Sequence, residues 1–381
     1  METERIYLSS PHMGGGEAKY VKEAFDTNWI APLGANINGF ENDIANYLGL
    51  TDAAALVSGT SAIHLGLKAL GVGHGDPVFC STLTFSASAN PIVYLEADPI
   101  FIDSDYKTWN MDPKALEKAF QVFPHPQAVV VVDLYGQSAD YNKILKICRE
   151  HDVPVLEDAA EALGSSYKGK KCGTFGDLSV LSFNGNKIIT TSGGGMLVGN
   201  NPDLIRKVRF WSTQSREPER WYEHKELGYN YRMSNILAGI GRGQMEVLDK
   251  RVEQKKHIYE TYEHAFSDIS EISMMPRVDN PNCWLSVITI GSESSVAPLD
   301  IMDALEAENI ESRPVWKPMH LEPVFRKFPI FTNLKKGTVA EDLFNRGVCL
   351  PSDTKMTDEN IQRVISIIRG LFNEQTIQRV S

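Results

Sequence analysis

The chain has 381 residues, of which 42% are hydrophobic and 23% charged, and it carries a formal net charge of −11 at pH 7. This is the ordinary balance of a soluble globular protein, and the length predicts about two domains. An acidic chain argues against nucleic acid and anionic membranes as main partners, although it does not exclude a phosphorylated small molecule.

The cysteines and the start of the chain indicate a reducing compartment. Five scattered cysteines form no C-x-x-C pair, which argues against a disulfide framework or a zinc site, so we expect no bound metal. Residues 1–5 (METER) contain no apolar signal region, and no stretch is long enough to span a bilayer. We therefore expect a cytoplasmic protein.

Two helices are predicted near the start of the chain. After a turn at residues 11–16, apolar residues at helical spacing predict a helix around residues 20–25, which residues 28–34 break. A second amphipathic helix is expected over about residues 40–48. The three glycines at 14–16 lack a preceding strand, so we interpret them as a turn and not as a phosphate loop.

Strands and helices alternate from about residue 52 to about residue 200, a pattern typical of a parallel sheet with helices on both faces. The segments expected as strands are 53–57, 77–80, 99–103, 128–133 and 153–158, with a helix predicted over about 85–95. The valine run in the fourth segment is typical of a strand buried on both faces. Such sheets bind ligands at the carboxyl ends of their strands.

The pattern changes after about residue 202. We expect a helix over 204–211, a polar and aromatic segment over 214–232, and a long helix over about 234–266 that Ser234 caps. Strands at 285–290 and 310–315, with helices at 298–307, 339–346 and 358–372, then indicate a smaller α+β part. We predict a large domain over residues 1–245 and a small domain over residues 246–381.

Three polar or aromatic motifs lie where strands are expected to end. Residues 58–61 (SGTS) can hold a phosphate with backbone amides and hydroxyls at a helix start, although an ordinary helix cap has the same pattern. Asp158 follows a buried strand and needs a partner, which is either a salt bridge or cap, or a pyridinium N–H. Phe85 either stacks on a flat ligand or joins the core.

Lys187 lies in a polar loop between an apolar run at 178–183 and a glycine turn. A lone lysine in a turn is most often a surface residue, but loss of hydration beside buried strand ends favours the neutral amine, which attacks carbonyl groups. The separation from Asp158 leaves room for a hairpin at 167–171, whose lysines we expect in solvent. A phosphate cradle, a stacking ring, an acid and an aldehyde-binding lysine together indicate pyridoxal 5′-phosphate (PLP).

These motifs resemble the sugar-nucleotide aminotransferases of the DegT type, which have the aspartate-aminotransferase fold (fold type I of PLP enzymes). The likeness covers nearly the whole chain and includes residues 58–62 (SGTSA), 157–162 (EDAAEA), 182–187 (SFNGNK) and 228–234 (GYNYRMS). Residues 28–34 and 184–196 look most like the bacterial aminotransferases of N-acetylbacillosamine biosynthesis. The resemblance implies an α/β large domain with a mostly parallel sheet and a smaller C-terminal α+β domain.

The resemblance also implies roles for residues around the cofactor. Lys187 would bind the aldehyde of PLP and move protons, and Asp158 would bind the pyridine nitrogen. Phe85 would lie against the ring, and Glu161 near its phenolic oxygen. The phosphate would be held by Thr60, Ser61 and Ser182.

Three further residues would act outside this group. Asn230 would reach the cofactor phosphate of the other subunit, so the active unit would be a homodimer with shared sites. Arg313 and His320 would border the nucleotide-sugar.

The chain departs from the family pattern at two places. Many relatives have Gln or His where this chain has Glu161, and a carboxylate beside a phenolate is repelled, so we expect Glu161 to be protonated or turned away. Many relatives have a Gly-Glu-Gly-Gly turn where residues 192–195 are SGGG. A dehydratase branch replaces the lysine by His, so the presence of Lys187 favours transamination.

The resulting prediction is transfer of an amino group from L-glutamate to the C4 ketone of a nucleotide-linked 4-keto-6-deoxy sugar. The preferred acceptor is UDP-2-acetamido-2,6-dideoxy-4-keto-hexose, and the alternative enzyme is a GDP-linked perosamine synthase. A PLP-binding regulator without turnover is the alternative from another class. A nicotinamide dehydrogenase is disfavoured, because no G-x-G-x-x-G follows a predicted strand.

Overall fold

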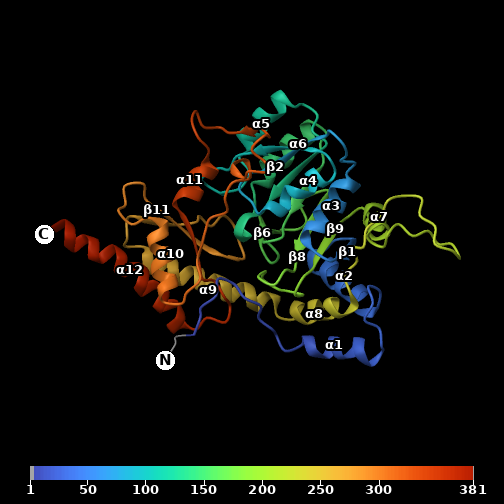
Figure 1. Cartoon of the computed structure of the whole chain (residues 1–381), viewed down its shortest axis with the longest axis horizontal. Coiled ribbons are helices and arrows are strands. Elements are labelled where there is room, and N and C mark those ends of the chain that lie inside the picture. The colour runs from blue at the N-terminus through green and yellow to red at the C-terminus, as the bar shows by residue number, and fades with distance from the viewer. Residues whose placement is uncertain (1–3, 381) are drawn as a thin grey trace.

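The computed structural model describes residues 4–380, and the side chains of residues 4–372. Figure 1 shows an α/β body that holds the large sheet and a smaller part that ends in α12 (Asp358–Val380). The long helix α9 (Leu248–Phe266) runs between these two parts. Among the described residues, we find no helix with the length and apolar character needed to cross a membrane.

The large sheet has eight strands in the order β1-β9-β8-β5-β4-β2-β3-β13. Their bounds, in the same order, are Asp52–Leu56, Gly195–Gly199, Leu178–Ser182, Val155–Asp158, Ala128–Val132, Pro77–Ser81, Asp98–Ile102 and Ile330–Phe331. Within this sheet β9 runs antiparallel to both neighbours, whereas the other adjacent pairs are parallel. The mostly parallel sheet is therefore confirmed, and the carboxyl ends of β2, β4, β5 and β8 share one edge.

Helices cover both faces of this sheet. One face packs against α3 (Gly59–Ala69), α4 (Asn90–Tyr94) and α7 (Pro202–Ser212). The other face packs against α2 (Ala35–Leu48), α5 (Pro113–Val122), α6 (Tyr141–Glu150) and α8 (Asn235–Met245), and α1 (Glu17–Asp26) packs on α8. Every residue of β4 is buried, which agrees with its sequence of one alanine and four valines, in which apolar and polar residues do not alternate.

Capping residues begin several helices at the positions that the sequence marks. The side chain of Asp112 accepts a hydrogen bond at the start of α5, and Asn201 does the same for α7; a proline follows each of them. Ser234 caps α8, as predicted. The predicted hairpin is also present as β6 (Ser166–Tyr167) and β7 (Lys170–Lys171).

Two predicted helices need correction. The segment 85–95 forms the 3-10 turn η1 (Ser86–Ser88) followed by the short helix α4. The long helix expected over 234–266 is divided into α8 and α9, because the backbone of Val247 leaves the helical conformation. Apolar spacing continues across both breaks, so periodicity alone does not reveal them.

The smaller part is built on a four-stranded sheet in the order β10-β11-β14-β12. Its strands are Ile272–Met274, Ser286–Ile290, Gly347–Leu350 and Arg313–Pro314. Residues of α9, α10 (Pro298–Ala307) and α12 form a hydrophobic cluster with this sheet, and α11 (Val339–Arg346) joins a second cluster beside it. The strand predicted over 310–315 is reduced to the two residues of β12.

Two segments cross between the parts. Near the start of the chain, Ile6 forms a bridge with Ile310 and joins the hydrophobic cluster of the smaller part. In the other direction, β13 pairs with β3 at the edge of the large sheet. The predicted boundary at residues 245/246 falls at the break between α8 and α9, and it stays a prediction.

Candidate active site

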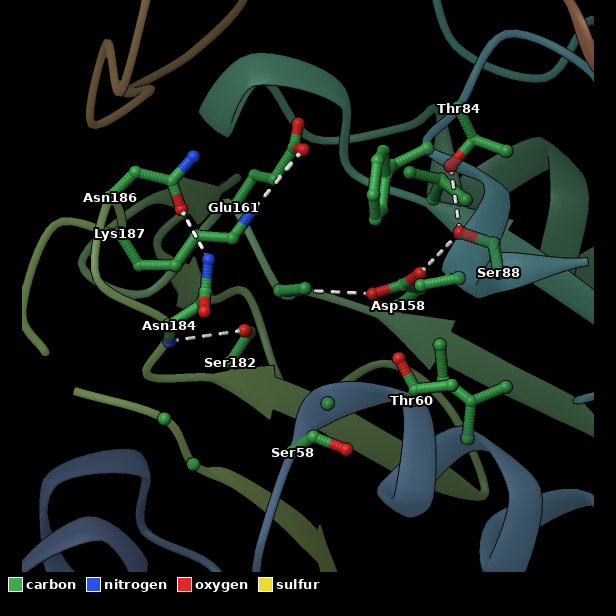
Figure 2. Close-up of a pocket in the computed structure, with 18 of the residues that line it drawn as sticks. Ser58, Thr60, Thr84, Ser88, Asp158, Glu161, Ser182, Asn184, Asn186 and Lys187 are labelled. Atoms are coloured by element: carbon green, nitrogen blue, oxygen red, sulfur yellow. Dashed lines mark hydrogen bonds and ion pairs between the residues drawn. The ribbon is translucent and has the colours of Figure 1, made fainter. Parts of the chain in front are cut away.

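A pocket of about 470 Å³ opens where the strand ends of the large sheet face the smaller part. Its wall includes the start of α3, the ends of β5 and β8, and the loop that carries Lys187 (Figure 2). Of the predicted site residues, the pocket contains Thr60, Phe85, Asp158, Glu161, Ser182 and Lys187. Six side chains that the sequence scatters over more than a hundred positions thus share one cavity.

Lys187 points its amine into this pocket, and its side chain is 13% exposed. Its Nζ lies 3.4 Å from Oε1 of Glu161 and 3.9 Å from the centre of the Trp284 ring. The interpretation of Lys187 as an ordinary surface lysine is therefore wrong. The backbone N–H of Lys187 donates to the Asn184 carbonyl at 3.0 Å, which closes the turn beneath the side chain.

Glu161 faces Lys187. Of the two alternatives that the sequence left open, a carboxyl that is turned away is therefore excluded, and a protonated carboxyl remains. Its Oε2 accepts a hydrogen bond from the Tyr135 backbone N–H at 2.7 Å. Burial raises the pKa of the Glu161 carboxyl, and the charge of Lys187 opposes that change. The raised pKa favours the protonated form, so this carboxyl can donate to an oxygen placed beside it.

Asp158 lies at the end of β5 with its carboxylate turned toward the pocket (Figure 2). Ser88 donates to Oδ2 at 2.6 Å, and the Ala160 N–H donates to Oδ1 at 3.2 Å. The Ser88 hydroxyl also lies 2.7 Å from the hydroxyl of Thr84. Burial raises the pKa of the Asp158 carboxyl, while these hydrogen bonds and the charge of Lys187 lower it. A cationic N–H in the pocket would further stabilise the carboxylate.

The N-terminus of α3 supplies the second polar wall. Ser58 caps this helix by accepting a hydrogen bond from the Ser61 backbone N–H at 3.0 Å. A side chain at Gly195 would place its Cβ 2.3 Å from the Ser58 backbone carbon, so glycine is required where β9 passes this turn. The close approach brings Thr60 and Ser182 to the same pocket, where free amides and the helix dipole favour an anion.

Aromatic rings form another wall of the pocket. Phe85 is 53% exposed, so it is not a core residue, and its ring lies 5.5 Å from that of Trp316. Trp316 stacks on Tyr135 at 5.9 Å, and the Tyr135 hydroxyl accepts its backbone N–H. Its buried indole N–H has no hydrogen-bond partner in the part of the chain that the structure describes. A flat ligand with polar edges suits this wall.

Four of the predicted site residues do not line the pocket. The Ser61 hydroxyl donates to the Ser58 carbonyl within the capping box, so Ser58 lines the pocket in its place. Asn230 is exposed on the segment that follows α7. Arg313 is exposed and pairs with Glu311. The roles of all four stay predictions.

His320 is the fourth of these residues, and it is tied into the fold. Its Nδ1 lies 2.7 Å from the Thr82 hydroxyl, and its Nε2 lies 3.4 Å from Glu341. Burial lowers the pKa of the His320 imidazole, while Glu341 raises it.

Several pocket residues were missed by the sequence reasoning. Thr84, Ser88, Trp284 and Trp316 were not recognised as site residues, whereas Ser58, Asn184 and Asn186 stand in the motifs 58–61 and 182–187 without an assigned role. Ser88 lies four residues after Thr84, a spacing that places both side chains on one side of a helical turn. Because Phe85 lies between them, this spacing could have indicated that the two hydroxyls face the same site. Trp284 has no comparable signal, because a lone tryptophan in a C-terminal segment reads as core.

A group of buried acids lies at the strand ends next to the pocket. One ligand atom each of Asp133, Glu157 and Cys172 lies within 4.8 Å of the others. Burial raises the pKa of the Glu157 carboxyl, while the four hydrogen bonds that it accepts, three from backbone N–H groups and one from Ser179, oppose that change. Oδ2 of Asp133 has no partner among the described residues.

A proton explains this arrangement better than a metal ion does. Burial and the neighbouring Glu157 raise the pKa of Asp133 well above its usual range. A protonated Asp133 can direct its O–H at Oε1 of Glu157, which accepts one other hydrogen bond, from the Gly173 N–H.

The pocket fits PLP on each side. The amine of Lys187 suits an aldehyde, Asp158 suits a pyridinium N–H, and the start of α3 suits a phosphate. The orphaned indole N–H of Trp316 is a further donor toward a polar ligand.

Comparison with known proteins agrees with this chemistry. Residues 11–369 match the model of the DegT/DnrJ/EryC1/StrS aminotransferase family. The chain is 49% identical to the putative pyridoxal phosphate-dependent aminotransferase EpsN of Bacillus subtilis, over 99% of this chain and 98% of that protein. It is 38% identical to the GDP-perosamine synthase of Caulobacter vibrioides, over 96% and 97%.

Solved structures confirm the fold. Helicobacter pylori PseC, an aminotransferase involved in the biosynthesis of pseudoaminic acid, superposes with a TM-score of 0.90 at 24% identity, over 97% of this chain and all of that one. The site and fold define a fold type I PLP enzyme. The chain belongs to the DegT/DnrJ/EryC1/StrS aminotransferase family, and its cofactor is PLP.

Proposed function

We propose that the protein moves an amino group from L-glutamate to the C4 ketone of a nucleotide-linked 4-keto-6-deoxy sugar. The preferred acceptor is UDP-2-acetamido-2,6-dideoxy-4-keto-hexose, which gives UDP-4-amino-4,6-dideoxy-GlcNAc. The observation that carries the proposal is that Lys187 and Asp158 face one pocket from the ends of neighbouring strands, beside a helix N-terminus. The choice of UDP rests on the resemblance of residues 28–34 and 184–196.

The chain's own side chains divide the work. Bound PLP supplies an aldehyde carbon that carries the amino group and a ring that accepts electrons. Nζ of Lys187 takes the proton from the substrate carbon and returns it, as general base and then general acid. Asp158, held by Ser88, keeps a proton on the pyridine nitrogen. Phe85 and Trp316 form one side of the pocket and offer their rings to the flat cofactor.

A GDP-linked acceptor is the second candidate, and a specific observation favours it. The GDP-perosamine synthase of Caulobacter vibrioides is 38% identical over nearly the whole length of both chains. The two candidate acceptors differ in the nucleotide and in the substituent at C2 of the sugar, so different protein contacts outside the cofactor pocket would be needed to bind them.

A spectroscopic experiment tests both candidates. Purified protein loaded with PLP should show the visible band of lysine-bound PLP, and L-glutamate should bleach it. Addition of the correct keto sugar should restore the band and yield an amino sugar that mass spectrometry detects. Restoration by the GDP-linked ketone alone would replace the preferred acceptor. A band that glutamate never bleaches would instead indicate a PLP-binding regulator.

We also propose that the active unit is a homodimer in which the partner completes the charge of the site. Among the residues that line the pocket, Lys187 is the one lysine or arginine, beside two buried carboxyl groups. Glutamate and a nucleotide diphosphate are both anions, so they need further positive charge. The segment 213–232 holds Arg216, Arg220 and the exposed Asn230, together with exposed Trp221, Tyr222 and Leu227.

Complementation tests this dimer. Lys187→Ala and Asn230→Ala subunits are each expected to have low activity alone. Mixed dimers should regain up to a quarter to a half of the wild-type activity, because one of the two sites then has both native residues. Mixtures that stay inactive, although light scattering shows a dimer, would exclude a shared site.

A further inference from the structure

A second lysine, Lys255 on α9, is buried without a counter-ion. It is 2% exposed, and its Nζ donates to the Ser352 carbonyl at 2.5 Å and to the Ser9 hydroxyl at 3.0 Å. It forms no ion pair with any residue that the structure describes. The nearby carboxylate of Asp353 accepts hydrogen bonds from Ser10 and from the Lys355 N–H instead. An ammonium held in this way costs folding free energy, so packing alone does not explain it.

The hydrogen bonds of Lys255 lead to the loop of Lys187. Ser9 donates its hydroxyl proton to the Asn186 carbonyl at 2.9 Å. The same carbonyl accepts the indole N–H of Trp284 at 2.7 Å, and the Trp284 ring lies under the Lys187 amine. The peptide that precedes Lys187 is therefore held from two sides.

The charge of Lys255 sets the direction of the hydrogen bond between the Ser9 hydroxyl and the Asn186 carbonyl. An ammonium group offers donors and no acceptor, so the Ser9 hydroxyl accepts from it and must turn its own proton to Asn186. A neutral amine has a lone pair that competes for this proton. Loss of the charge therefore loosens one of the two bonds that hold the Asn186 carbonyl.

We propose that Lys255 is a positioning residue for Lys187: its ammonium directs the Ser9 hydroxyl onto the Asn186 carbonyl and fixes the loop that carries the reactive amine. The inference rests on the proposed function of Lys187 in amino transfer. It links the start of the chain, α9 and the segment after β14 to the active-site loop.

The surroundings of Lys255 place its titration near neutral pH. Burial lowers the pKa of Lys255 to about 7, and the carboxylate of Asp353, after β14, opposes that change. The thiol of Cys283, before β11, is also close, but burial raises its pKa to about 12, so it carries no charge near pH 7. The hydroxyl of Ser9 should therefore hold Asn186 more firmly below pH 7 than above it.

Hydrogen exchange of the cofactor-free protein tests the proposal without any reaction. Lys255→Met and Ser9→Ala should each speed amide exchange in the peptide around residues 182–192 by about fivefold, the value of one modest hydrogen bond. Lys250→Met, which replaces an exposed lysine on the same helix, is the matched control and should leave exchange unchanged.

Kinetics of the PLP-loaded enzyme give the second readout. The wild-type kcat should show an inflection near pH 7 that both variants lose, with KM for glutamate unchanged, whereas Lys255→Arg should keep kcat high above that pH. Wild-type exchange and a wild-type pH profile in Ser9→Ala would overturn the proposal, even if Lys255→Met fails to fold. A wild-type protein that never transfers an amino group would overturn the proposed function and leave the exchange test standing.

Discussion

The two walls of the active-site pocket are built in different ways. The strand-end wall consists of Asp158, Ser182 and the start of α3, each fixed by a short motif and by backbone hydrogen bonds of the large sheet. The aromatic wall consists of Phe85 and of Trp284 and Trp316; these two tryptophans lie more than a hundred residues after Ser182 and stack on Tyr135.

The two walls therefore contribute to the reaction in different ways. The strand-end wall carries the groups that exchange protons and charge, so a single atom change there should affect the rate strongly. The aromatic wall orients the Lys187 loop and shields the pocket, so its residues should tolerate conservative change. The first three substitutions below test this division and the fourth tests the turn after Lys187, in order of expected effect.

Lys187→Ala should abolish transfer, with a fall in kcat of roughly a thousandfold or more, because no other amine lines the pocket in the described chain. Steady-state assay with L-glutamate and a keto sugar measures the effect. Lys168→Ala, an exposed lysine of the hairpin, should retain full activity. A Lys187→Ala protein with a normal rate would show that the assignment is wrong.

Asp158→Asn should lower kcat by about 100-fold and weaken PLP binding, because a neutral amide cannot hold the proton of the pyridine nitrogen. Ser88→Ala removes one donor to the same carboxylate and should cost only about fivefold. Equal effects of the two changes, measured by kcat and by titration with PLP, would contradict the division between the carboxylate and its support.

Trp284→Phe should lower kcat by about fivefold, because the Asn186 carbonyl loses the indole N–H while the ring that faces Lys187 is largely kept. Tyr106→Phe provides the control, since Tyr106 is an exposed aromatic residue that does not line the pocket. A loss as large as that of Asp158→Asn would mean that the aromatic wall takes part in the chemistry.

Ser192→Gly should leave activity unchanged and stabilise the fold by about 0.5 kcal/mol. Ser192 has a φ of 71°, a left-handed conformation that costs a non-glycine residue about 1 kcal/mol, and the flexibility of glycine in the unfolded chain offsets part of the gain. Denaturant unfolding measures the change, with Ser192→Ala as a control that keeps the strain. Destabilisation by Ser192→Gly would show that the hydroxyl is needed.

The sequence predicted the strand-end wall because its signals are local. A strand followed by Ser58-Gly59-Thr60, or by Asp158, needs only its own neighbours to be recognised, and the family resemblance strengthened both. Phe85 could be recognised in the same way, whereas the two tryptophans of the aromatic wall depend on how the smaller part docks, which no local pattern encodes. The sequence also did not predict the helix break at Val247 or the pairing of β13 with β3 at the edge of the large sheet, because both depend on contacts between distant segments.

The raised pKa of Asp133 beside Glu157 implies that the stability of this fold falls as the pH rises. The pKa of Asp133 is raised in the folded protein, so its contribution is complete below the unfolded value of about 4 and is lost as the pH rises toward the folded value. Two adjacent carboxylates would then repel each other between β4 and β5.

Asp133→Asn keeps a donor toward Glu157 without a titrating proton. The free energy of unfolding of this variant should therefore fall less steeply with rising pH than that of the wild type. Because Asp158 ends the same strand as Glu157, repulsion between the neighbouring carboxylates of Asp133 and Glu157 is expected to act on the end of β5, which lines the cofactor pocket.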